Sequence, residues 1–114
     1  MAGFHRLTIE QGATFEERYE IVGDDEQPWP IPATWKVRAQ IRAAPLAPAV
    51  ILDLAQLLSV DHAAGTITLR IPATTTTGLD RGGVWDLELY DPDDPGQVSR
   101  LLAGPVDLDA EVTR

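Results

Sequence analysis

Two carboxylates spaced two residues apart are the pair in this sequence best placed for acid–base chemistry. Asp86 and Glu88 lie in the alternating run GVWDLELYD (83–91), so both side chains point to one face of a strand. Paired carboxylates can serve as general acid and base. The same alternation also describes the polar face of a half-exposed strand, and nothing else in the chain indicates a substrate pocket. We therefore expect a polar strand face and no enzyme.

Other catalytic patterns are missing from the sequence. Ser59 and Ser99 lack the flanking glycines of a nucleophile elbow, and no glycine-rich turn opens a helix that could bind phosphate. The chain has no cysteine, which removes thiolate nucleophiles and disulfides. His5 and His62 are not at metal-ligand spacing, and we expect both imidazoles to be solvated at the surface.

Two acidic segments, 24–26 and 91–94, could supply oxygen ligands to Ca²⁺. Neither segment matches the spacing of a calcium-binding loop. Proline and glycine within DPDDPG favour a tight turn in which aspartate side chains accept hydrogen bonds from their own backbone. We therefore expect no metal and no cofactor.

The elements that must position these residues are short strands. Strict alternation of apolar and polar residues is clearest over 35–42 (WKVRAQIR). Turn signals follow about every ten residues, and no amphipathic helix is convincing. The pattern predicts an all-β fold, an antiparallel β-sandwich that is immunoglobulin-like or jelly-roll-like, with about seven strands and at most one short helical turn near 72–79. The expected strands are 7–9, 15–21, 35–42, 50–54, 66–71, 85–90 and 98–108.

Charged side chains gather by sign along two of these strands. The basic group on one strand face is Lys36, Arg38 and Arg42, and the acidic group is Glu16, Glu17 and Glu20. If the two strands pair, the groups form cross-strand ion pairs worth a few tenths of a kcal/mol each. If they do not pair, they mark surfaces of opposite sign that suit head-to-tail contacts around a ring. Pairing is the interpretation we favour.

The proline-rich loop GDDEQPWPIP (23–32) presents a large aromatic side chain, Trp29. Such a residue either folds back to cap the core or anchors a partner, and the cap is favoured. Trp35 and Trp85 lie on the apolar faces of their strands, so we expect both in the core.

Length and charge limit the organisation and the partners. The 114 residues suit one domain, 1–114, with a short N-terminal lead (1–5) and a polar C-terminal arm (109–114). A formal net charge of −9 argues against nucleic-acid binding. No apolar run is long enough for a membrane span, and the first residues lack a signal-peptide pattern.

Several stretches together resemble a phage family. They are LTIEQGATF, the WKVRAQIR strand, VILDL, GTITLRIPATTT, the GVWDLELYD strand and SRLLAGPVDLDAEVTR, and they cover the chain from about residue 7 to 114. The sequence is similar to small tailed-phage virion proteins related to the N-terminal domain of baseplate upper proteins. The resemblance implies a β-sandwich that anchors receptor-binding or fibre components. The chain stops at Arg114 without a fibre-forming extension, which implies a free-standing adaptor, plug or decoration.

The resemblance therefore implies a bacteriophage virion structural protein, a tail, baseplate or fibre-anchoring adaptor made in the host bacterial cytoplasm and resident in the virion. Its partners would be other virion proteins, with homo-oligomers in the particle and no nucleic acid or membrane. A capsid decoration protein and a carbohydrate-binding β-sandwich that contacts the host surface are the alternatives. The expected interface residues are Trp29, Ile31, Lys36, Arg38, Arg42 and Arg114.

Overall fold

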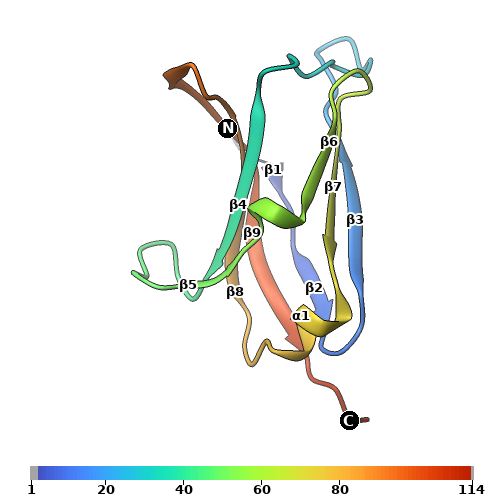
Figure 1. Cartoon of the computed structure of the whole chain (residues 1–114), viewed down its shortest axis with the longest axis vertical. Coiled ribbons are helices and arrows are strands. Elements are labelled where there is room, and N and C mark those ends of the chain that lie inside the picture. Colours follow the sequence, from blue (N-terminus) through green and yellow to red (C-terminus); the bar gives the residue numbers. More distant parts are fainter. Residues whose placement is uncertain (1–2, 114) are drawn as a thin grey trace.

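Two β-sheets pack face to face in the computed structural model, which describes residues 3–113 (Figure 1). The larger sheet has six strands in the order β1-β9-β8-β4-β5, with β2 also paired to β9, and the smaller sheet has the order β3-β7-β6. This arrangement confirms the predicted β-sandwich. The elements are β1 (Gly3–Phe4), β2 (Leu7–Glu10), β3 (Phe15–Glu20), β4 (Lys36–Arg42), β5 (Val50–Asp53), η1 (Ala55–Leu57), β6 (Leu58–Asp61), β7 (Thr66–Ile71), α1 (Ala73–Thr77), β8 (Gly83–Asp91) and β9 (Asp94–Asp109).

The core lies between the sheets and is built by alternation. Every second residue of β7 and β8 is buried, and both tryptophans expected in the core pack there, Trp85 at 3% exposure and Trp35 partly buried against the cluster. Each fully buried leucine or isoleucine side chain in these strands stabilises the fold by about 1.5–3 kcal/mol. The most buried hydrophobic residues are Leu7, Ile9, Ile31, Ala39, Ile41, Leu54, Ile67, Leu69, Ile71, Leu79, Trp85, Leu87, Leu89 and Val106.

The N-terminal residues are part of the large sheet. Strands β1 and β2 both run parallel to β9, with Gly3 opposite Leu102 and Leu7 opposite Val106. The other strand pairs are antiparallel. Part of the expected N-terminal lead is therefore strand. At the other end, β9 stops at Asp109, and the expected polar arm begins there.

The preferred pairing of the basic and acidic strands is wrong. Strand β4 pairs with β5 and β8, whereas β3 pairs with β7 in the opposite sheet. The basic side chains of β4 therefore meet acids of β8, and Glu16 of β3 lies 3.7 Å from Arg70 of β7. The sequence pattern shows which residues share a strand face but not which strands become neighbours.

Two short helical segments connect strands. One turn of α-helix, α1, lies within the segment predicted to hold a helical turn, and the 3₁₀ turn η1 precedes β6. Thr76 of α1 is fully buried and donates its hydroxyl to the carbonyl of Ala13 at 2.8 Å, which ties α1 to the β2–β3 turn. No helix in residues 3–113 has the length and apolar character needed to cross a membrane.

Aspartate side chains accept backbone hydrogen bonds in two turns, as predicted for DPDDPG. The Asp25 carboxylate accepts from the backbone N–H of Gln27 at 3.0 Å, and the Asp91 carboxylate accepts from the N–H of Asp93 at 2.9 Å. Each of these side-chain to backbone hydrogen bonds stabilises the turn in which it forms. Within the described part of the chain, no cluster of three or more histidine and carboxylate side chains could hold a metal ion.

Candidate functional site

A polar cluster joins the two sheets at one open side of the sandwich. His5, between β1 and β2, donates from Nε2 to Oε1 of Glu17 on β3 at 2.9 Å, and the hydroxyl of Tyr19 donates to the same oxygen at 2.9 Å. The side chains of His5 and Glu17 are each 36% exposed. His5 is therefore only partly solvated, and the expectation of a free surface imidazole holds only in part.

Aromatic packing and a backbone bond hold His5 in place. Its ring meets Tyr19 and Trp85 edge-on, with centroids 5.5 and 6.2 Å away, and the indole N–H of Trp85 donates to the His5 carbonyl at 2.9 Å. Gly104 of β9 lets the chain pass closely, because a Cβ built there would lie 2.2 Å from the His5 carbonyl oxygen.

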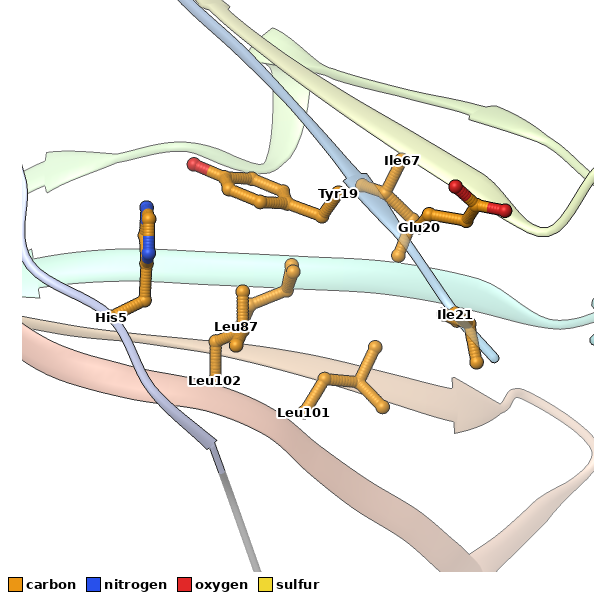
Figure 2. Close-up of a pocket in the computed structure, with 8 residues that line it drawn as sticks. All are labelled: His5, Tyr19, Glu20, Ile21, Ile67, Leu87, Leu101 and Leu102. Carbon is orange, nitrogen blue, oxygen red and sulfur yellow. The ribbon is translucent and has the colours of Figure 1, made fainter. Parts of the chain in front are cut away.

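A hollow of about 320 Å³ opens beside this cluster (Figure 2). Leu101 and Leu102 are consecutive in β9, yet Figure 2 shows both pointing into the hollow. The cause is a β-bulge, since the register of β9 against β8 shifts between Leu102 and Arg100. The lining residues are His5, Tyr19, Glu20, Ile21, Ile67, Leu87, Leu101 and Leu102.

The electrostatics of the cluster keep the phenol neutral. Burial, and then the hydrogen bond to the Glu17 carboxylate, raise the pKa of Tyr19 well above its usual range. The hydroxyl therefore stays protonated and remains a donor. The site combines an apolar hollow with polar groups at one end, which suits binding of an apolar group attached to a polar chain.

The second candidate site is the outer face of the six-stranded sheet, where charges of both signs form cross-strand pairs. Arg38 donates from Nε to Glu88 at 2.8 Å, and its guanidinium carbon lies 4.6 Å from the ring centroid of Tyr90. Arg100 of β9 lies 3.4 Å from Asp86. This face is the predicted polar strand face, with each carboxylate beside an arginine.

Burial, and then repulsion from Glu88, raise the pKa of Asp86, while Arg100, Arg38 and Arg42 act in the opposite direction. Asp86 also lines two hollows on this face, of about 660 and 400 Å³.

The β4–β5 loop projects from the sandwich (Figure 1). Its residues Pro45 and Leu46 line the larger of these hollows. All of its residues, AAPLAPA (43–49), are apolar, and all but Ala47 are exposed, with Leu46 at 95%. Arg42 fixes the shape of the loop, because its Nη1 donates to the Ala47 carbonyl at 2.8 Å while two other nitrogens contact Gln40.

The structure separates the predicted interface residues. Lys36 and Arg38 are exposed on the outer face, whereas Arg42 braces the loop. Ile31 is only 3% exposed, so it is a core residue and its prediction as a contact is wrong. Arg114 lies outside the described residues.

Trp29 remains 38% exposed and packs against Trp35 with ring centroids 6.2 Å apart, which is the geometry of a partial cap. Its backbone is held as well: Trp29 N–H donates to the Ile21 carbonyl at 2.9 Å. Pro32, at the end of the Trp29 loop, is contacted by a residue from another part of the chain. His62, expected to be solvated, lies with its Nδ1 3.0 Å from the Pro32 carbonyl oxygen.

The residues that sequence reasoning missed are Glu17 and the bulged leucines. Alternation itself carried a signal for Glu17, because it shares the inward face of its strand with Phe15 and Tyr19. The bulge that turns both Leu101 and Leu102 inward left no such signal.

The strand order defines an immunoglobulin-like β-sandwich, in which β1, β2, β9, β8, β4 and β5 form one sheet and β3, β7 and β6 form the other. Among solved structures the chain is similar to Tim-1, with a TM-score of 0.50 and 9% identity over 100% of this chain and 99% of that one. It is also similar to a chain of the ZIG-8–RIG-5 IG1–IG1 heterodimer, with a TM-score of 0.45 and 8% identity over 95% and 82%. No family model and no curated protein matches the chain. These likenesses concern the fold alone.

Proposed function

We propose that this chain is a non-catalytic protein-binding module of a tailed-phage particle, an adaptor in the tail, baseplate or fibre attachment. The observation that carries the protein-binding role is the exposed apolar loop 43–49. Leu46 is 95% exposed, so its side chain contributes no burial energy to the isolated chain. Covering it with a partner would remove its apolar surface from water and so stabilise the complex. The phage setting rests on the sequence resemblance.

The loop has the properties of an anchor that is ready to bind. Two prolines restrict the backbone angles of the loop. The Ala47 N–H donates to the Ala44 carbonyl at 3.0 Å, and the Ala47 carbonyl accepts from Arg42. A loop that is already ordered loses less conformational entropy on binding than a flexible one. Next to it, Val50 is 39% exposed and extends the apolar surface.

Charges around the loop favour a protein partner of mixed character. Arg42 and Arg100 lie on the outer face beside the loop, together with Asp86 and Glu88. An apolar centre with paired charges around it is the usual composition of a protein interface. A surface of both signs also selects one orientation of the partner.

The test is the copy number of this chain per purified virion, measured by quantitative mass spectrometry against the major capsid protein. A small number of copies supports a position in the tail, baseplate or fibre junction. A ratio near that of the capsid protein supports the alternative, a capsid decoration protein. Absence from purified particles overturns the proposal and directs attention to glycan binding.

A further inference from the structure

Two strand edges are unpaired where the sandwich is open. Among residues 3–113, strand β3 pairs with β7 alone, so its other edge is free. On the facing sheet β1 pairs with β9 from Gly3 and Leu102 onward, and within the described residues the part of β9 before Leu102 pairs only with β8. The hollow beside His5 lies between these two edges.

The backbone of β3 offers hydrogen-bonding groups at its free edge. Ile21 N–H donates to the Gly65 carbonyl at 2.8 Å, on the β7 side. Bonded residues alternate along an antiparallel pair. The N–H and C=O groups of Glu16, Arg18 and Glu20 therefore point away from β7, toward the open side, as a template for another strand.

The hollow is placed to receive side chains from such a strand. A strand added to β3 would direct every second side chain between the sheets, where Ile21, Leu101 and Leu102 form an apolar lining. The volume of about 320 Å³ gives room for aliphatic side chains. The His5–Glu17 contact closes the opening near the start of β3. The part of β3 that follows Glu17 is therefore the accessible edge.

The rim of the hollow is acidic. Glu20 lines it, is exposed, and makes no hydrogen bond or ion pair among the described residues. The half-exposed carboxylate of Glu17 lies on the same side. A strand that carries basic side chains between its apolar ones would complement these charges.

We propose that the free edge of β3 binds an extended segment of a partner protein with alternating apolar and basic side chains. The segment adds as a fourth strand to the small sheet, and its apolar side chains enter the hollow. The inference names the chemistry of a partner for the proposed adaptor and rests on that function for its biological setting. The binding itself is a property of this chain and can be measured without particles.

The first experiment uses a capped synthetic peptide of alternating lysine with valine or leucine as the probe. Amide hydrogen exchange of the ¹⁵N-labelled protein is measured by NMR with and without the peptide. Exchange at Arg18 and Glu20 should slow by about tenfold or more at saturation, and the Leu101 and Leu102 methyl signals should shift. A peptide with glutamate in place of lysine should bind at least about tenfold more weakly. A peptide with proline at every second position should give no protection, because it cannot pair.

Paired variants test the hollow and the rim separately. Leu101→Trp fills the hollow and should weaken binding about tenfold, whereas Val98→Trp on the exposed face of the same strand should not. Glu20→Lys should weaken binding of the lysine peptide, and Glu10→Lys on β2 should not. Each variant is first checked for an unchanged NMR fold, and one that unfolds is replaced by Leu101→Phe or Glu20→Gln.

Protection at the β5 edge instead, or no protection at any peptide concentration, overturns the inference. Because the virion copy number is measured on particles and peptide binding on the purified chain, the failure of one is distinguishable from the failure of the other.

Discussion

Nε2 of His5 and Oε1 of Glu17 lie 2.9 Å apart and connect the two sheets of the sandwich across its open side. His5 follows β1 in the large sheet, and Glu17 is the inward-facing acid of β3 in the small one. Domains of this fold often have a disulfide between the sheets, and this chain has no cysteine. A hydrogen-bonded cluster therefore provides a polar link between the sheets.

Removing the Glu17 carboxylate should weaken this link. Glu17→Ala takes the acceptor away from both His5 and Tyr19, and we expect the free energy of unfolding to fall by about 1–2 kcal/mol. Urea denaturation followed by fluorescence measures the change. Glu20→Ala, on the same strand but without a side-chain partner among the described residues, should change it by less than about 0.5 kcal/mol. Equal effects of the two variants would contradict the structural role of Glu17.

Tyr19 should make the fold sensitive to alkali. Its pKa is raised in the folded chain, so the folded state holds the phenolic proton more tightly than the unfolded state does. The contribution is complete below the ordinary tyrosine pKa of about 10 and is lost as the pH rises above it. Tyr19→Phe should therefore lose less stability between about pH 9 and 11 than the wild type. Tyr90→Phe, which deletes a phenol on the outer face, is the control, and an equally steep loss in Tyr19→Phe would refute the prediction.

Gly104 should tolerate no side chain. A Cβ at this position meets the carbonyl carbon and oxygen of His5 at 2.8 and 2.2 Å, so alanine must push β1 away from β9. We expect Gly104→Ala to destabilise the fold by about 1–3 kcal/mol and to speed hydrogen exchange in β1. Gly78→Ala is the control, because a Cβ there comes no closer than 3.6 Å to the nearest atom. A stable Gly104→Ala protein with protected β1 amides would show that the contact is unimportant.

Asp86 should cost stability when it ionises. Its pKa is raised in the folded state, so the neutral form is favoured there, and the stability that this group contributes is lost as the pH rises through the aspartate range. The stability of Asp86→Asn relative to the wild type should therefore increase from about pH 3 to about pH 7. Urea denaturation at several pH values measures this difference. A relative stability that decreases with pH would mean that the ion pair with Arg100 dominates.

Leu46 should matter for assembly and not for folding. Leu46→Glu places a charge on a side chain that is 95% exposed, so the free energy of unfolding should change by less than about 0.5 kcal/mol. Its incorporation into virions should fall by about tenfold or more, because the charge cannot enter an apolar partner surface. Val112→Glu, at a site 93% exposed, is the matched control. Normal incorporation of Leu46→Glu would remove the loop from the proposed interface.

Much of the fold could be predicted from local alternation. The run 35–42 became β4 with its apolar residues inward, and 66–71 became β7. Alternation has period two and depends only on burial of one face, so it is visible in a single sequence. Strand β6 was not among the expected strands, because its apolar run is short.

The neighbours of each strand were not predictable in this way. Pairing of β4 with β8 and of β3 with β7 is set by how the whole chain folds, and charge complementarity between Arg38 and Glu17 gave no guide to it. The polar cluster was missed for the same reason, since His5 and Glu17 meet only when the two sheets close. Ile31 was assigned to the surface because of its loop, yet its N–H donates to the His62 carbonyl at 2.8 Å and its side chain is buried.

The parallel pairing of the first strands with the last one has a consequence during synthesis. Residues Gly3 and Leu7 find their partners at Leu102 and Val106, almost the full length of the chain later. Contacts of such large sequence separation slow folding. Strands β1 and β2 must therefore wait for β9, and the six-stranded sheet can close only after β9 has been translated.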